Sequence, residues 1–194
     1  QLLPYIDSLV KTMTVMKPNS ATFSLLLGLR NVVEKTGIAP EKIYASVLAS
    51  EKERFNQVAF KAARVLQTLG YEFCYSGEDE LYSGALLYEL GYWEDFAQYG
   101  QKVLQVFEAS KAKTIVCLSP HAAEVIKLLY PQVGLKHDFE VKTFIELVWE
   151  KRAQLPRLST EQTVVIHDSC RLARDLGVTE EPREVLSAMG VDFN

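Results

Sequence analysis

Short apolar segments alternate with longer amphipathic ones from residue 42 onward, and this alternation limits the possible folds most strongly. The segments expected to form strands cover residues 42–48, 71–76, 113–119, 139–144 and 163–168. The segments expected to form helices cover residues 53–69, 94–109, 121–129, 143–153 and 182–189. Strands that alternate with helices of this length are typical of βαβ units. The sequence therefore predicts an α/β fold with a mostly parallel sheet flanked by helices.

The first 41 residues have a different pattern, because their apolar residues recur at helical spacing. Pro18, Asn19 and Ser20 separate two such stretches, with Ser20 as a plausible N-cap and Gly37 as a plausible stop. We therefore expect an N-terminal helical segment over residues 1–41, ahead of the α/β part.

An internal repeat with a spacing of 120 residues is also visible. Gly70 and Gly190 are related by this spacing, as are Phe73 and Phe193, and each pair follows an expected strand and helix. The repeat divides the chain into a first unit over 42–160 and the start of a second over 161–194. The alternative is that any two βαβ openings look alike, with a glycine before the next strand.

Composition excludes several classes of protein. The formal net charge of −4 argues against a nucleic-acid-binding surface, where a basic face would be expected. No apolar run reaches the roughly 18 residues of a transmembrane helix, and no secretory signal is visible at the start. Three cysteines are too few for a disulfide framework and indicate reducing, cytoplasmic conditions. CxxC, HExxH, GxGxxG and Walker motifs are all missing from the sequence.

Four segments together resemble a known family. They read GEDELYSGALLYELGY, AKTIVCLSPHAAEVIKLLYP, FEVKTFIELV and VVIHDSCRLARDLGVTEEPREVL. In order and spacing they resemble the cysteine-rich (CCG) domain found in heterodisulfide reductase. The iron–sulfur subunits of glycolate oxidase and of anaerobic glycerol-3-phosphate dehydrogenase share that domain. The family's motifs are a cysteine pair followed by glycine, a CPxC before a helix ending in Tyr-Pro, and HDPC.

The resemblance assigns cluster-ligand positions, but most of these positions carry no sulfur. The cysteine pair falls on Tyr82 and Ser83, the CPxC cysteines fall on Ser119 and Ala122, and the first ligand falls near Ser50. Thiolates hold the iron of such clusters, and hydroxyl groups are poor replacements. The resemblance thus implies a first unit whose ligands are lost.

Cys170 differs from these positions, because HDSC matches HDPC. The resemblance implies that Cys170 is the first cluster ligand of the second unit, and that the chain is part of a longer protein. A 4Fe–4S cluster is then expected in the longer protein and none in the present chain. Chain segments after residue 194 would have to supply the remaining cysteines.

The resemblance also implies a function. It predicts part of an iron–sulfur oxidoreductase subunit that transfers electrons, with the first unit as a scaffold and with flavin or iron–sulfur subunits as partners. Nucleic acid is not an expected partner, no transmembrane segment is expected, and the location is cytoplasmic, with membrane attachment through partners left open. The alternative is a non-redox protein-interaction module derived from the same fold. Whether the protein is an enzyme stays open, and the present chain alone is expected to be inactive.

Several further side chains have two interpretations. Cys117 and Cys74 each follow apolar strand residues and are expected to be buried core thiols, with a stray ligand or redox thiol as the alternative. His121 is expected to be a solvated histidine at a helix start. The alternative is a single-metal site formed by Cys117, His121 and Cys170. His137 lies in a polar loop and is expected on the surface.

The charged residues around Cys170 have their own predictions. Asp168 is expected to cap the loop that follows it. Arg171, Arg174 and Arg183 could neutralise an anionic cluster or substrate. Nine aromatic residues between 71 and 99 are expected to fill a core and its rim, with a cofactor cleft as the alternative.

Overall fold

The computed structural model of the chain describes residues 52–159 and 163–194. The helical segment expected over 1–41 and the strand expected over 42–48 lie outside the described residues. Residues 62–194 form one compact unit, and the candidate site lies within this unit. Within the described ranges no helix is both long enough and apolar enough to cross a membrane.

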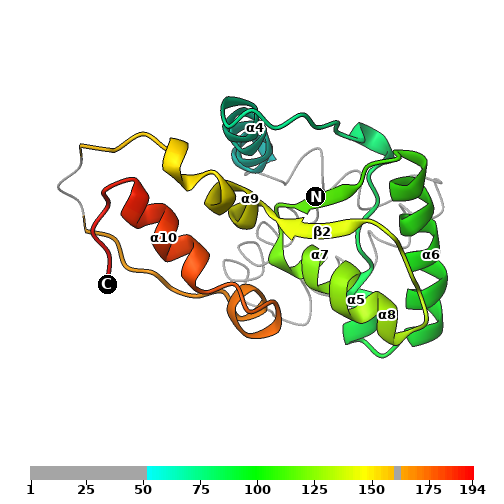
Figure 1. The fold of residues 1–194 in the computed structure, drawn as a ribbon. Helices are drawn as coiled ribbons and strands as arrows, with labels where there is room; N and C mark the ends of the chain where they lie inside the picture. The colour runs from blue at the N-terminus through cyan, green and yellow to red at the C-terminus, as the bar shows by residue number, and fades with distance from the viewer. Residues whose placement is uncertain (1–51, 160–162) are drawn as a thin grey trace, which may run out of the picture. The chain divides into compact units, whose positions relative to one another are not determined.

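Two parallel strands form the sheet of this unit (Figure 1). Strand β1 (Thr114–Cys117) pairs with β2 (Glu140–Thr143), with Thr114 opposite Glu140 and Cys117 opposite Thr143. The connection between them is helical, through α7 (Pro120–Glu124), the π-helical turn η2 (Val125–Leu129) and α8 (Tyr130–Gln132). Parallel strands require such a crossover connection. The predicted α/β fold class is therefore confirmed.

Helices pack against this sheet and bury its main core. The short helices η1 (Gly77–Asp79) and α5 (Ala85–Glu89) precede the long helix α6 (Trp93–Ala109). The core side chains come from α6, the crossover and both strands: Phe96, Val103, Leu104, Cys117, Val125, Ile126, Tyr130 and Val141. On α6, these residues recur at the spacing of one helix face, as an amphipathic helix over a core requires.

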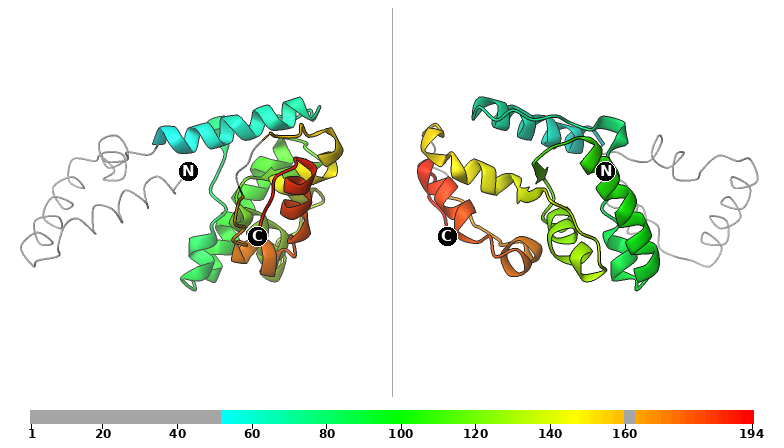
Figure 2. Two further views of the ribbon diagram at one scale, coloured as in Figure 1. Left: turned by 90° about the vertical axis from the view of Figure 1, so that its left-hand side faces the viewer. Right: turned by 45° about the vertical axis from the view of Figure 1, so that its right-hand side comes forward.

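The C-terminal part of the unit has a second, smaller core. Helix α9 (Phe144–Glu150) follows β2 directly, and a capping box between Thr143 and Glu146 fixes its start. Helix α10 (Glu180–Ala188) lies beside α9, as the views in Figure 2 show. Val148 of α9 and Val185 of α10 are buried there together with Leu69. The short turns η3 (Arg152–Gln154) and η4 (Arg171–Asp175) lie between these helices in the sequence.

The predicted helices are confirmed, with changed ends. Helix α4 (Lys52–Thr68) matches the segment 53–69, and α6 matches 94–109. The segment expected over 121–129 begins at Pro120, and α10 begins at Glu180, two residues before its expected start. The segment expected over 143–153 divides into α9 and η3, because Lys151 leaves the helical conformation.

Two strand predictions are wrong for the described residues. Residues 71–76 form no strand, and the segment 163–168 is reduced to one parallel bridge between Val164 and Phe193. A strand is stable only when a neighbouring strand satisfies its backbone hydrogen bonds, and no described strand lies next to residues 71–76. Cys74 is consequently exposed, which corrects the expectation of a buried core thiol.

The ends of α4 and α10 have the same geometry, at the spacing of the sequence repeat. Gly70 and Gly190 both have a φ of +73°, a conformation that glycine adopts without steric cost. Tyr71 N–H donates to Leu66 C=O, and Val191 N–H donates to Leu186 C=O, both at 3.0 Å. Each partner in the second bond lies 120 positions after its counterpart in the first. This agreement is what the predicted repeat requires at the ends of these two helices.

Candidate functional site

The position of the family's cysteine pair lies immediately before α5 and is bonded to the protein itself. The Tyr82 hydroxyl accepts a hydrogen bond from Leu86 N–H at 3.2 Å, and burial raises the pKa of that hydroxyl. Ser83 is buried, and its carbonyl accepts a hydrogen bond from the Tyr130 hydroxyl at 2.9 Å. Gly84 has a φ of +80°, so the glycine of the motif supplies a left-handed turn before the helix.

The position of the family's CPxC motif forms the start of α7. Ser119 is the exposed N-cap residue in extended conformation, and Pro120 occupies the first turn, where a proline is well tolerated. Ala122 is half-buried and packs against the main core. The Tyr-Pro of the same motif supplies Tyr130, whose hydroxyl bonds to Ser83. The two degenerate motifs are thus joined by a hydrogen bond between side chain and backbone.

The remaining ligand positions have different outcomes. Cys170 is exposed and begins the turn η4 as its N-cap residue. Ser50 lies outside the described residues. Its assignment as a ligand position therefore stays a prediction from the resemblance.

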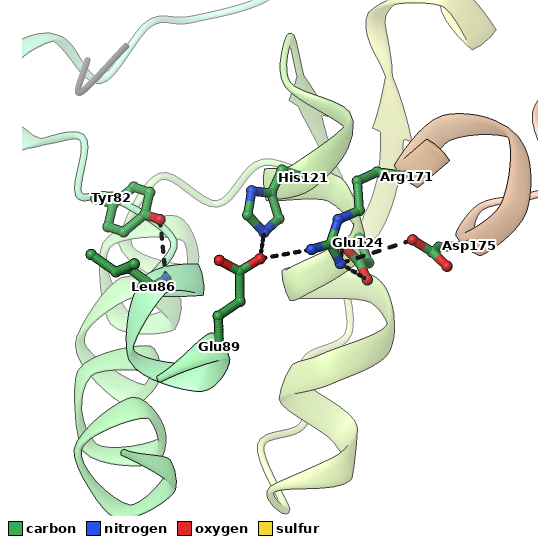
Figure 3. A network of polar contacts seen from close by, with 7 residues as sticks. All are labelled: Tyr82, Leu86, Glu89, His121, Glu124, Arg171 and Asp175. Atoms are coloured by element: carbon green, nitrogen blue, oxygen red, sulfur yellow. Dashed lines mark hydrogen bonds and ion pairs between the residues drawn. The ribbon is translucent and has the colours of Figure 1, made fainter. Parts of the chain in front are cut away.

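A network of charged side chains connects α5, α7 and η4 (Figure 3). The Arg171 guanidinium donates to both carboxylate oxygens of Glu124 at 2.8 Å, and to Glu89 Oε1 at 2.6 Å. Asp175 Oδ2 lies 3.9 Å from the same guanidinium. His121 Nε2 lies 3.2 Å from Glu89 Oε1, outside hydrogen-bond geometry. One arginine therefore bridges three elements that the resemblance associates with cluster ligands.

Burial makes the Glu124 contact the most consequential of the network. The Glu124 side chain is only 7% exposed, whereas those of Arg171 and Glu89 are 35% and 40% exposed. Partial burial lowers the pKa of Arg171, but the hydrogen bonds and charges of Glu124 and Glu89 outweigh it and raise that pKa. A buried carboxylate needs such a partner, because an unpaired buried charge is strongly destabilising.

A second arginine holds the other side of the Cys170 turn. Arg183 of α10 forms a bidentate ion pair with Asp168 at 2.8 and 3.0 Å. The hydrogen bonds from Arg183 lower the pKa of Asp168. Asp168 thus pairs with a helix that follows it, which corrects the expectation that it caps the adjacent loop. The positive charges of Arg171 and Arg183 are likewise matched by carboxylates of the chain, so neither is a free counter-charge for an anion.

The side chains at the degenerate ligand positions do not fit an iron–sulfur cluster. Tyr82, Ser83, Ser119 and Ala122 supply no thiolate, which such clusters require. In addition, the Tyr82 hydroxyl and the Ser83 backbone already have partners within the protein. We therefore derive no chemistry through a cluster at these positions.

The alternative single-metal site is not formed. Among the residues that the structure describes, no three His, Cys, Asp or Glu side chains lie close enough to hold a metal ion, and this includes the set Cys117, His121 and Cys170. Cys117 is buried at the end of β1, as expected of a core thiol. Burial, together with the charges of Glu80 and Glu146, raises the pKa of its thiol to about 12. It is a protonated, unreactive group at neutral pH.

Two further expectations need correction. His137 is half-buried, and its ring nitrogens lie 3.0 Å from Phe139 O and 3.1 Å from Ile126 O. It therefore joins the crossover to the start of β2, and it is not a free surface residue. His121 is half-buried beside Glu89, and it is not a fully solvated side chain.

The aromatic residues between 71 and 99 are divided between core and surface. Tyr88, Phe96 and Tyr99 belong to the main core or pack against it. Phe73, Tyr75, Tyr92 and Trp93 are exposed. The core expectation therefore holds for only part of this group.

Sequence analysis missed the carboxylates of the ion network. Glu124 and Glu89 lie 47 and 82 residues from Arg171 along the chain. One signal was available, since Glu124 is the only charged residue within the apolar run AAEVI. A carboxylate on a buried helix face requires a cationic partner, but the sequence does not say which one.

Comparison with known proteins supports the resemblance seen in the sequence. The chain is 31% identical over 143 residues to the probable iron–sulfur-binding oxidoreductase FadF of Bacillus subtilis, in a match that covers 73% of this chain. It is 32% identical over 151 residues to a subunit of the dihydromethanophenazine:CoB–CoM heterodisulfide reductase of Methanosarcina acetivorans, over 70% of this chain. It is 29% identical over 171 residues to the EtfAB:quinone oxidoreductase of Syntrophomonas wolfei, over 83% of this chain.

These relatives are much longer than the matched region. The matches span 20% of FadF, 24% of the EtfAB:quinone oxidoreductase and 35% of the heterodisulfide reductase subunit. No protein-family model matches the chain. No solved structure matches it significantly. The chain is therefore a relative of iron–sulfur oxidoreductases, as its resemblance to the cysteine-rich domain family of heterodisulfide reductase indicated.

Proposed function

We propose that this chain is part of a longer iron–sulfur oxidoreductase subunit that transfers electrons, in which residues 42–160 act as a scaffold. In this proposal residues 161–194 open a second cysteine-rich unit, and Cys170 is the first ligand of a 4Fe–4S cluster there. The remaining cysteines would come from other parts of the polypeptide.

The observation that carries this proposal is the contrast between the two sets of ligand positions. Ser83 is buried and hydrogen-bonded through its carbonyl, and Tyr82 bonds to the start of α5. Cys170, in contrast, is an exposed thiol at the start of a turn. A position that binds a cluster must present its sulfur to the metal, and only Cys170 does so. The relatives supply the redox class, since they are iron–sulfur oxidoreductases by name.

Partners and location belong to the same proposal. The relatives are named as a quinone oxidoreductase, as one subunit of heterodisulfide reductase and as a probable membrane-anchored ferredoxin. Flavin or iron–sulfur subunits are therefore the proposed partners, with a cytoplasmic location and attachment to a membrane through them.

Iron analysis of the longer polypeptide tests the proposal. After anaerobic preparation we expect about four iron and four acid-labile sulfide per cluster, with an EPR signal that depends on redox state. A Cys170→Ala variant should lose that iron, while a Cys74→Ala variant should keep it. Iron and sulfide near zero in the unaltered polypeptide would refute the electron-transfer proposal.

A protein-interaction module is the second candidate, and one observation favours it. Leu86, Leu90, Tyr92 and Trp93, on α5 and just after it, are all more than half exposed. Exposed apolar side chains that gather in one region mark interaction sites more often than isolated ones do. If iron is missing but the longer polypeptide still binds its partner subunits, this second function is the better account.

A further inference from the structure

The turn that carries Cys170 is held from two sides by arginine–carboxylate pairs. On one side Asp168, two residues before Cys170, pairs with Arg183 of α10. On the other side Arg171, immediately after Cys170, pairs with Glu124 of α7 and Glu89 of α5. Cys170 itself stays exposed between these two anchors.

The two anchors differ in burial. Asp168 and Arg183 are 37% and 30% exposed, so water screens their attraction. The Glu124 carboxylate is 7% exposed and is bound by both of its oxygens to the Arg171 guanidinium. A fork of this kind fixes orientation as well as distance, which a single charge contact does not. The Arg171 side is therefore the stronger constraint on the turn.

We propose that Arg171 is a positioning residue, which holds the Cys170 turn in a fixed orientation against α7 and α5. In this arrangement the ion network joins the three segments that the resemblance associates with cluster ligands, in a unit whose own ligand positions lack sulfur. The first unit then acts on the second through the orientation of one cysteine. The network itself concerns the chain alone, while the identity of Cys170 as a ligand rests on the proposed function above.

A role of Arg171 as a counter-charge for a bound anion fits the contacts less well. Its guanidinium is already surrounded by Glu124, Glu89 and Asp175, at 2.8, 2.6 and 3.9 Å. Three carboxylates around one cation leave a net negative environment, which repels a second anion. The same contacts are what a residue needs in order to hold a turn in place.

Hydrogen exchange of the 194-residue chain tests the network directly. The amides of Ala173, Leu176 and Val178 report on the turn, because they donate to carbonyls of residues 169, 171 and 172. In an Arg171→Met variant these amides should exchange at least about tenfold faster. The amide of Met189, which donates to Val185 of α10, should not change.

The Lys142→Met variant is the matched control. Lys142 also pairs with two carboxylates, Glu140 and Glu150, but on β2 and α9. Its loss should leave exchange in the turn unchanged. An Arg171→Lys variant keeps the charge without the fork and should restore part of the protection. If Arg171→Met does not fold, Glu124→Gln removes the same ion pair and should accelerate the same amides.

Two results of this experiment would overturn the proposal. One is unchanged exchange at the three turn amides in Arg171→Met. The other is acceleration of these amides together with that of Met189 by the same factor, because it would reveal a general loss of stability without local anchoring.

The longer polypeptide tests the effect on Cys170. With Arg171→Met we expect unchanged iron content but altered g-values or line width in the EPR spectrum of the cluster. An unchanged spectrum in a polypeptide that contains iron would refute the positioning role. Iron missing from the unaltered polypeptide would refute the proposed function instead, and the hydrogen-exchange result on the chain would still decide the role of the network.

Discussion

Removal of the Tyr130 hydroxyl is the sharpest test of how the two degenerate motifs are joined. Tyr130 is fully buried, and its hydroxyl donates to the Ser83 carbonyl at 2.9 Å. Burial raises the pKa of this hydroxyl, so it stays protonated and able to donate at any pH near neutrality. A Tyr130→Phe variant keeps the ring in the core and deletes only the donor.

The expected loss of stability follows from the environment of the bond. Ser83 is also buried, at 6% exposed, so water does not replace the lost donor. A buried polar group left without its partner costs about 1–3 kcal/mol. For a unit of this size each kcal/mol lowers the melting temperature by roughly 3 °C. Because the ring remains, we expect no additional cavity cost.

Tyr88→Phe is the matched control for this experiment. The Tyr88 hydroxyl donates to Gln132 Oε1 at 3.1 Å at an exposed position, where water can take over the bond. Its loss should change the free energy of unfolding by less than about 0.5 kcal/mol. Denaturant unfolding at pH 7, monitored by circular dichroism, measures both variants. Equal effects of the two variants, or a loss below about 0.5 kcal/mol for Tyr130→Phe by the same criterion, would contradict the reasoning.

Three further predictions concern other parts of the same unit. A Cβ on Gly100 would lie 2.8 Å from the Tyr130 ring. We therefore expect Gly100→Ala to lower the free energy of unfolding by about 1–2 kcal/mol, since overpacking outweighs the gain in helix propensity. Unchanged or raised stability would show that the core yields easily. The pKa of Cys117 rises from 9.0 to about 12, so its thiolate fraction at pH 8 should be about 10³-fold below the ordinary one. Alkylation followed by peptide mapping should thus modify exposed Cys74 and spare Cys117, and comparable rates would refute its burial. Arginine lowers the pKa of Asp168 below 3.8, so its ion pair stabilises the fold above about pH 4 and is lost as the pH falls through the lower folded-state pKa. Carboxyl NMR titration measures this directly, and a value at or above 3.8 would be incompatible with the ion pair.

Local sequence pattern determined the elements of the βαβ unit and its place in a family. The apolar runs around residues 114–117 and 140–143 are strands, and the amphipathic segment between them is the crossover. Such patterns encode structure locally, because the period of apolar residues decides which backbone form can bury them. The redox class was also readable, since the order and spacing of the motifs remain although the cysteines are gone.

Tertiary structure alone decided which side chains meet. The segment 71–76 has an apolar content typical of a strand, but no described strand pairs with it, and Cys74 is exposed as a result. Arg171 was visible in the sequence only as a charge near Cys170, whereas its partners Glu124 and Glu89 come from α7 and α5. Contacts between residues 47 and 82 positions apart depend on how helices pack, which no local period specifies. The sequence therefore determined that this unit lacks the sulfur for a cluster, and the packing decided that an arginine links the segments to which those ligands would belong.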